Sequence, residues 1–245
     1  MLHTQSYTVL GIPISATNPQ SAMSHVLGWV NDDVGRFICV REVSSLMVCK
    51  NDPYLLALHS DASLVFPDGM PLVWIGKKRG FDVQRTCGPD FMELMMASSV
   101  ERNLKHYLFG GKPGVVEKLA DKIRGRYPGV DIVGKETPPF RTMTELEKEA
   151  TRQRILNSGA DIVWVGISSP KQDVWMHENF RQLSQTLIGV GAAFDFLSGE
   201  VNRAPVWMQR LGLEWLSRLY SEPRRLWRRY LILAPKFVWQ VFREK

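Results

Sequence analysis

The chain has 245 residues, of which 44% are hydrophobic and 23% charged. This composition is typical of a globular protein with a sizeable core, and it excludes an intrinsically disordered chain. The sequence has no run of about 18 apolar residues, so it predicts no membrane-spanning helix. The formal net charge of +6 comes from the last 43 residues, which carry ten Lys/Arg against three Asp/Glu.

Short apolar runs alternate with longer mixed segments along the chain. The apolar runs predict strands at residues 7–14, 37–40, 63–66, 106–109, 131–133, 162–167 and 187–190. The mixed segments predict helices at residues 20–30, 53–59, 69–78, 90–101, 113–126, 144–156 and 171–183. Because most of these strands are apolar on both faces, we expect an α/β fold with a largely parallel sheet and helices on both sides.

A change in charge near residues 199–203 marks the predicted division of the chain. We expect a core over residues 1–202 and a C-terminal appendage over residues 203–245. The three cysteines lack the spacing of a metal site, and two lie inside apolar runs, which predicts buried free thiols and a reducing compartment. Residues 1–7 are polar and lack the apolar core of a signal peptide, so export is not predicted.

The turns that follow the strands are candidate binding sites, because ligands of parallel sheets bind at the carboxyl ends of strands. In the first of four such turns, Gly110, Gly111 and Lys112 follow a strand and open a helix. Glycines allow close backbone approach, and free N–H groups at a helix start favour a phosphate. The turn lacks the Walker A sequence and the full dinucleotide glycine pattern, so a plain strand-to-helix turn is an equally good interpretation.

Two further turns carry polar side chains. Around Ser169, Lys171 and Gln172 a cation and an amide lie at the mouth of the sheet, and Pro170 suits the start of a helix. Asp195 follows small residues in the next turn, where it either contacts a ligand or caps the turn. Two such turns beside a basic appendage favour a nucleotide with a diphosphate.

The fourth turn contains Asp68 between Pro67 and Gly69. Asp is a favoured N-cap, so a structural role at the start of the next helix is one interpretation. The other is catalytic, because a carboxylate at the end of a strand in a cleft can act as a general base. Arg85 and Asp90 follow on a nearby loop, where they form either a structural salt bridge or part of the same site.

The appendage mixes its cations with eight aromatic residues. On a helical wheel, one side carries the basic residues Arg225, Arg228, Arg229, Lys236 and Arg243. The other side is mainly apolar, although Pro235 predicts a kink or a division of the helix. This pattern is typical of a helix that lies on an anionic membrane surface. The alternative is a terminal helix that packs on its own domain with a solvated charged face. No motif supports binding to nucleic acid.

Seven motifs in order along residues 8–233 resemble those of the bacterial WecG/TagA/CpsF family of glycosyltransferases. They are Pro67-Asp68-Gly69; Arg85 with Gly88 and Asp90; residues 109–113; residues 169–172; residues 189–191 with Asp195; residues 203–205; and Leu213-Glu214-Trp215 continuing to Arg218. The resemblance implies a Rossmann-like core and an inverting transfer from a UDP-sugar to a polyprenyl-diphosphate-linked saccharide, without a cofactor. It also implies an appendage that docks at the membrane and helps to complete the site.

On this resemblance Asp68 is the expected catalytic base, with Glu42 and Arg85 beside it. The expected substrate contacts form a larger set: Gly110, Gly111, Lys112, Ser169, Lys171, Gln172, Asp195, Arg203, Arg218, Arg225 and Arg228. The sequence contains no Asp-x-Asp metal motif, so we expect no metal ion. Guanidinium groups of the appendage would then stabilise the departing UDP, because they bind phosphate oxygens bidentately.

Glu42 departs from the pattern of the family, many members of which have an Asn there. An amide donates and accepts hydrogen bonds, whereas an ionised carboxylate only accepts them. A second carboxylate would repel an acidic sugar unless a cation such as Arg41 screens it. We therefore expect a neutral hexose, among donors that in this family include N-acetylmannosamine, its uronic acid and glucose.

Two other classes of function stay open. An NAD-linked oxidoreductase would need a complete glycine-rich turn after the first strand, and Gly11-Ile12-Pro13 does not provide one. A non-catalytic nucleotide-binding membrane adaptor would use the tail but would leave Asp68, Arg85 and Lys171 unexplained. We expect a cytoplasmic protein, peripheral on the inner face of the cell membrane. The sequence does not determine whether the protein forms a homo-oligomer.

Overall fold

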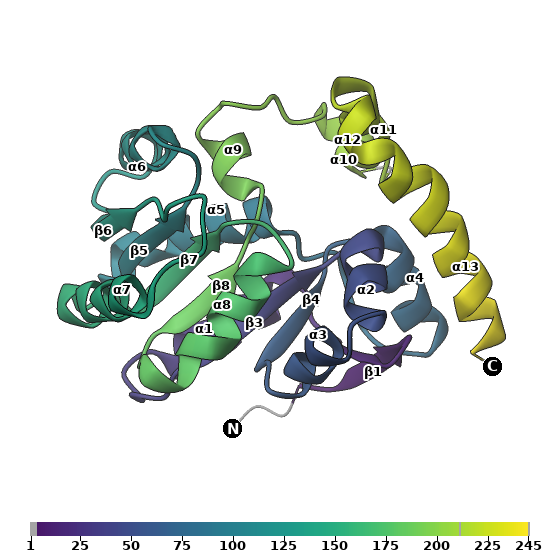
Figure 1. Ribbon diagram of the computed structural model, residues 1–245, viewed down its shortest axis with the longest axis horizontal. Coiled ribbons are helices and arrows are strands. Elements are labelled where there is room, and N and C mark those ends of the chain that lie inside the picture. The colour runs from purple at the N-terminus through teal and green to yellow at the C-terminus, as the bar shows by residue number, and fades with distance from the viewer. Residues whose placement is uncertain (1–3, 211, 245) are drawn as a thin grey trace.

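A six-stranded parallel sheet in the order β4-β3-β8-β7-β5-β6 forms the centre of the computed structural model, which describes residues 4–210 and 212–244 (Figure 1). Its strands are β3 (Arg36–Arg41), β4 (Leu64–Pro67), β5 (Lys105–Gly110), β6 (Asp131–Glu136), β7 (Ile162–Gly166) and β8 (Thr186–Gly189). Every neighbouring pair in this sheet is parallel. The predicted Rossmann-like α/β fold is confirmed.

Both faces of the sheet are buried, because alternate residues of each strand enter different cores. In β7, Val163 and Val165 belong to one apolar cluster and Trp164 to the other. The first cluster includes side chains of α2 (Val43–Lys50), α3 (Pro53–Ala57), α4 (Met70–Lys78), α7 (Glu145–Ser158) and α8 (Lys171–Asn179). The second includes side chains of α1 (Pro19–Trp29), α5 (Gly88–Ser99), α6 (Val115–Arg126) and α9 (Ala193–Leu197). Burial on both sides explains the uninterrupted apolar runs of these strands.

The first apolar run forms a hairpin and not the single strand predicted for residues 7–14. Strands β1 (Ser6–Val9) and β2 (Ile12–Ser15) pair antiparallel in a separate sheet. Between them Leu10 and Gly11 have φ values of 50° and 86°. Two consecutive residues in this region make the tight turn whose twist matches a hairpin. The apolar side chain of Leu10 concealed the turn in the sequence.

Helix α2 was not predicted. Five of its eight residues are buried, so it lacks the polar face that gives a helix its sequence period. Glu42 starts the helix, because its carboxylate accepts hydrogen bonds from the backbone N–H groups of Ser44 and Ser45 at 2.9 Å and 2.7 Å. The hydroxyl of Ser45 accepts in return from the N–H of Glu42, which completes a capping box.

From Arg203 onward the chain forms a helical tail that runs beside α2 and α4 (Figure 1). Its helices are α10 (Val206–Arg210), α11 (Glu214–Ser221), α12 (Pro223–Trp227), a π-helical turn labelled η4 (Arg228–Leu233), and α13 (Ala234–Arg243). Pro235 lies in the first turn of α13, directly after the π-helical turn. The helix is not divided at Pro235, because it continues from α12 through the π-helical turn into α13. The wider turn lies next to the residue that cannot donate an intrahelical hydrogen bond.

One face of the tail packs on the core. Leu226 and Phe237 are buried, Lys50 Nζ donates to Gln240 Oε1 at 2.9 Å, and the N–H of Leu10 donates to Glu244 Oε2 at 3.1 Å. The alternative of a terminal helix packed on its own domain is therefore correct for this face. No helix within residues 4–210 and 212–244 is both long and apolar enough to cross a membrane.

The opposite face of the tail is apolar and exposed. Trp239 is 53% exposed and Phe242 68% exposed. The guanidinium carbon of Arg243 lies 3.8 Å from the centroid of the Trp239 ring. The outward face thus combines aromatic rings with cations, and differs from the purely charged solvated face of the alternative interpretation.

Candidate active site

Two carboxylates follow neighbouring strands at the same edge of the sheet. Strands β3 and β4 are parallel, with Arg41 opposite Pro67, so Glu42 and Asp68 are the next residues of each. The N–H of Asp68 donates to the carbonyl oxygen of Arg41 at 2.8 Å. A Cβ atom at Gly69 would lie 3.4 Å from the Cα atom of Glu42, which is van der Waals contact. The strand ends therefore hold the two acids side by side.

Asp68 does not cap the following helix. Helix α4 has Gly69 at its N-cap and no side-chain cap, so the capping interpretation is wrong. The Asp68 carboxylate instead accepts hydrogen bonds from Arg85, from Nη2 at 2.9 Å and from Nε at 3.2 Å. Burial raises the pKa of Asp68 above its usual value, and the nearby carboxylates of Glu214 and Glu42 act in the same direction, although the Arg85 guanidinium opposes them. Its side chain is 25% exposed, so a ligand can reach it.

Glu42 is engaged by donors from two parts of the chain. Besides capping α2, it accepts from the hydroxyl of Ser44 at 2.6 Å. Arg229, on the π-helical turn of the tail, binds both the Glu42 carboxylate and the Ser44 hydroxyl. Burial acts to raise the pKa of Glu42, but the charge of Arg229 and the hydrogen bonds outweigh it and hold this pKa below its usual value. Glu42 therefore anchors the tail at the sheet edge.

Arg41 is not the cation that screens Glu42. Its side chain is fully buried, its Nη2 lies 3.0 Å from Asp173 Oδ1, and its Nε donates to His59 Nε2 at 2.8 Å. Arg41 therefore does not supply the screening that an acidic sugar would need, because successive side chains of a strand point to opposite faces. Asp173 also accepts from the hydroxyl of Ser169 at 2.6 Å. The buried pair thus connects β3 to the turn that follows β7.

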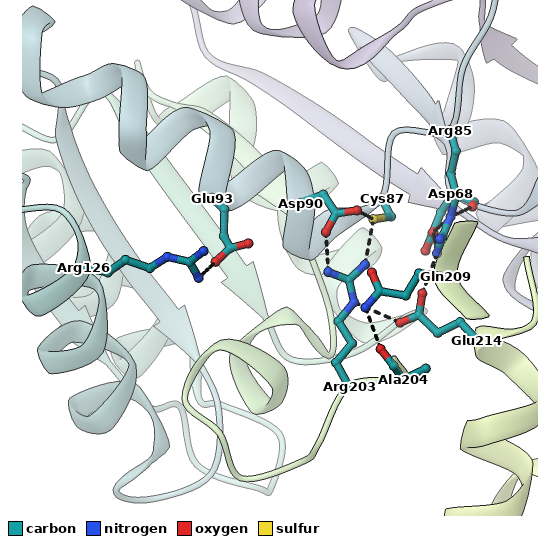
Figure 2. Close-up of polar contacts among 10 residues, drawn as sticks. All are labelled: Asp68, Arg85, Cys87, Asp90, Glu93, Arg126, Arg203, Ala204, Gln209 and Glu214. Carbon is teal, nitrogen blue, oxygen red and sulfur yellow. Dashed lines mark hydrogen bonds and ion pairs between the residues drawn. The ribbon is translucent and has the colours of Figure 1, made fainter. Parts of the chain in front are cut away.

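A network of ion pairs joins the tail to Asp68 (Figure 2). Glu214 at the start of α11 lies between two arginines, with Oε2 3.0 Å from Arg85 Nη2 and Oε1 3.1 Å from Arg203 Nε. Arg203 also pairs with Asp90 and donates to Cys87 Sγ at 3.5 Å. The proposed salt bridge between Arg85 and Asp90 is therefore wrong, because each of them pairs elsewhere.

The glycines after β5 bring two strands close together. Gly110 has a φ of 144°, and a Cβ atom there would lie 2.5 Å from the backbone of Gly166. The N–H of Gly111 donates to the carbonyl oxygen of Gly166 at 3.0 Å. The close approach of the two strands is therefore a structural reason for glycine here, in addition to the expected phosphate contact. Lys112 follows them, at the same edge of the sheet.

The turns after β7 and β8 are linked by Gln172. Its buried side chain accepts a hydrogen bond from the N–H of Gly191 at 3.0 Å. Lys171 beside it is exposed, and Asp195 lies half-buried in α9. Because all strands are parallel, these turns lie at the sheet edge that also carries Asp68. The structure brings the predicted strand-end residues to one edge.

The tail arginines lie in different surroundings. The guanidinium of Arg218 lies 5.3 Å from the centroid of the Phe196 ring, next to α9. Arg228 is exposed and stacks on Trp227, also at 5.3 Å. The side chain of Arg225 lies outside the described part of the structure. Arg203 and Arg218 thus face core residues, whereas Arg228 lies on the outer side of the tail.

The sequence alone suggested no role for Glu214, and it placed Arg229 only on the basic side of the helical wheel. Glu214 carried one detectable signal, since it is one of three acids in a segment with ten cations. All three cysteines are buried and unpaired, as predicted. In the described ranges, no group of three or more His, Cys, Asp or Glu side chains could hold a metal ion.

The chain also matches a known protein family. The model of the family described as Glycosyl transferase WecG/TagA/CpsF matches residues 7–245. The match covers the hairpin, the sheet, the strand-end turns and the tail, and so includes every residue of the network around Asp68. The chain belongs to the WecG/TagA/CpsF family of glycosyltransferases, enzymes of polysaccharide synthesis.

Proposed function

We propose that the chain is an inverting transferase that moves a hexose-type sugar from a UDP-sugar to a polyprenyl-diphosphate-linked saccharide. The observation that carries this proposal is Asp68, a partly exposed carboxylate at the sheet edge whose pKa is raised by burial. In the proposed step Asp68 takes the proton of an acceptor hydroxyl. The oxygen then attacks the anomeric carbon from the side opposite UDP, the bond to UDP breaks, and UDP leaves with the electron pair.

The departing diphosphate needs positive charge and N–H donors around it. Lys112 and Lys171 at the strand-end turns, with the glycines after β5, are the proposed contacts on the core. Arg218 supports a contribution from the tail, because its stacking on Phe196 holds it beside α9. Arg225 and Arg228 stay proposed contacts. Arg203 has a different role in this proposal, since its guanidinium is already paired with Glu214 and Asp90.

The charge of Glu42 bears on the choice of sugar. A second carboxylate without a counterion would repel an acidic donor and so favour a neutral hexose. Arg229 compensates that carboxylate, so the repulsion is weaker than the sequence suggested. Glu42 is therefore proposed as a residue that holds Arg229 in place and not as a second base. Because it accepts hydrogen bonds from Ser44 and Ser45 as well, its oxygens are already engaged.

The tail is the proposed membrane-docking part of the enzyme, and residues 1–202 the proposed catalytic core. The outward face of the tail carries exposed Trp239 and Phe242, with Arg243 stacked on Trp239. Aromatic rings in the interface and cations near lipid phosphates stabilise a peripheral helix on an anionic membrane. The same tail places Glu214 and Arg229 at the sheet edge. We therefore propose that the protein works on the inner face of the cell membrane, where a lipid-linked acceptor would be presented.

The proposal is tested with a panel of UDP-sugars and a lipid-diphosphate acceptor. The panel contains N-acetylmannosamine, its uronic acid and glucose as donors, and UDP release is measured with and without acceptor. One donor should give acceptor-dependent release, and NMR of the product should show an inverted anomeric centre. Retention of configuration would contradict the mechanism, and the absence of acceptor-dependent release with every donor would contradict the function.

Metal independence makes a separate prediction, based on the arginines of the tail. With excess chelator, turnover should persist, because guanidinium groups would supply the charge at the diphosphate. Arg218→Ala should lower turnover, whereas Arg102→Ala, an exposed residue beyond the end of α5 that is farther from Asp90, serves as the matched control. Loss of activity with chelator that added Mg²⁺ or Mn²⁺ restores would show that a metal ion supplies the charge instead.

A further inference from the structure

Glu214 occupies an unusual position in the basic tail. Its side chain is only 12% exposed, and each of its carboxylate oxygens faces a different arginine. One oxygen lies 3.0 Å from Arg85 and the other 3.1 Å from Arg203. Charge-assisted contacts of this kind are stronger than neutral hydrogen bonds. Glu214 therefore holds the first turn of α11 against the core, at the edge that carries Asp68.

The contact with Arg85 is shared with Asp68. The same nitrogen, Nη2, lies 2.9 Å from Asp68 Oδ1 and 3.0 Å from Glu214 Oε2. The Nε group of Arg85 also donates to the carbonyl oxygen of Asp68 at 2.6 Å, which keeps the guanidinium in place beside it. Two carboxylates thus compete for the charge of one cation. With the tail absent from this position, Arg85 would serve Asp68 alone.

We infer that Glu214 is a positioning residue that couples docking of the tail to the strength of Asp68 as a base. This inference rests on the proposed function. A carboxylate held by an unshared guanidinium is a weak proton acceptor, because the cation stabilises its ionised form. When α11 is docked, the negative charge of Glu214 offsets part of that stabilisation. Docking therefore makes Asp68 more basic at the moment when the tail closes the site.

Other ionisable groups also lie near Asp68. Glu42 at the start of α2 pairs with Arg229 from the π-helical turn. The Asp68 charge also acts on Arg229, on Tyr230 of the same turn and on the Cys87 thiol, which donates to Asp90. Glu214 differs from these groups because it contacts the guanidinium that holds Asp68. Its influence agrees in direction with the raised pKa of Asp68.

The test compares the full-length chain with Glu214→Gln and with a matched control, Glu244→Gln. Both substitutions remove one negative charge from a tail side chain that contacts the core. Glu244 accepts from the N–H of Leu10 at the other end of the tail, so its loss frees only the end of α13 and leaves Glu214 beside Arg85. Two readouts are used: the pH dependence of kcat/KM, and the titration of the Asp68 carboxyl followed by NMR with ¹³C-labelled Asp, assigned with Asp68→Asn.

In Glu214→Gln the titration of Asp68 and the acid limb of kcat/KM should both move to lower pH. In Glu244→Gln both should stay at their wild-type positions. Exchange of tail amides should rise about tenfold in Glu214→Gln, the effect of losing one hydrogen bond to a charged group. If Asp68 titrates at the same pH in the wild type and in Glu214→Gln, the inference is wrong. If the wild type turns over no UDP-sugar, the proposed function fails, while the NMR titration still decides the role of Glu214.

Discussion

The Asp68 carboxylate shows how opposing effects set the properties of a single residue. Burial and the carboxylates of Glu214 and Glu42 raise its pKa, whereas Arg85 lowers it. The raised pKa means that burial and like charge outweigh the cation. A general base is most effective when its pKa lies nearer the working pH than that of a free carboxylate. The surroundings of Asp68 thus favour a catalytic role over a purely structural ion pair.

Replacement of this carboxylate tests that role. Asp68→Asn should lower turnover by about 10² to 10⁴, the usual range for a lost general base, with near-normal binding of UDP. Steady-state kinetics and calorimetry with UDP measure the two effects separately. Asp82→Asn, an exposed acid earlier on the same loop as Arg85, is the matched control and should have wild-type turnover. Wild-type turnover in Asp68→Asn would remove Asp68 from the role.

Two buried histidines predict how stability depends on pH. Burial lowers the pKa of His59 and of His106 from 6.5 to about 4 in each case. Below pH 6.5 the unfolded chain binds protons at these residues that the folded chain does not bind until about pH 4, so the free energy of unfolding falls as the pH decreases through this window. Urea midpoints across the window should fall, and the fall should be smaller in His106→Gln. A midpoint that does not change with pH would contradict the prediction.

Packing of α8 against β3 depends on a buried ion pair. Arg41 and Asp173 are both fully buried and 3.0 Å apart, and Asp173 also holds the Ser169 hydroxyl. Such a pair adds little stability by itself, because removing both charges from water is costly. Its value here is positional, since it connects the strand before Glu42 to the turn that carries Ser169 and Lys171. The contacts of this ion pair therefore link the buried core to the proposed nucleotide site.

Breaking this pair should be costly. Asp173→Asn leaves the charge of Arg41 buried without a counterion and should lower the free energy of unfolding by about 3–5 kcal/mol. The pair of Arg36 and exposed Asp32 provides the control, and Asp32→Asn should change this free energy by less than about 1 kcal/mol. Urea denaturation of both variants measures the difference. Equal effects in the two variants would show that the buried pair does not contribute in this way.

The elements that the sequence predicted well are those with a clear period or an apolar run. The six strands of the parallel sheet were all predicted. Five of them are largely buried, which requires apolar residues on both faces, and the edge strand β6 contains the short apolar run Ile132-Val133. The hairpin was missed because Leu10 is apolar and gives no sign of the turn. Helix α2 was missed because its polar residues Ser44 and Ser45 are themselves buried. In both cases tertiary contacts determined the structure, and the local sequence pattern gives no sign of them.

The sequence does not show which distant side chains pair with each other in the folded molecule. The sequence placed Asp68, Lys171 and the glycines at strand ends, because topology follows from the alternation of elements. It did not pair Arg229 with Glu42, which is 187 residues away in the chain, or Glu214 with Arg85. Nothing in either local segment indicates such a contact. The expected pairing of Arg85 with Asp90 failed for the same reason, since Asp90 pairs with Arg203 of the tail.

The exposed face of the tail predicts how the whole molecule meets a membrane. Trp239→Glu combined with Phe242→Glu should lower co-sedimentation with anionic vesicles by at least roughly tenfold, because each ring would otherwise bury apolar surface in the interface. Wild-type binding should weaken as salt rises, since the screening length is about 10 Å at 0.1 M. Phe140→Glu, an exposed aromatic between β6 and α7, is the control and should bind as the wild type does. Unchanged binding of the double variant would contradict the assignment of this face.

The hydrogen bond between Leu10 and Glu244 also has a consequence for the order of events during synthesis. The groups that contact the end of α13, Leu10 and Lys50, belong to the core, which leaves the ribosome before the tail. Domains generally fold as units, and those nearer the N-terminus fold first during synthesis. The tail, made after the core, therefore packs on a surface that is already folded, and its exposed rings acquire their ordered arrangement only after the core has folded. A newly made chain thus gains its exposed aromatic face at the same time as it gains Glu214 beside Arg85.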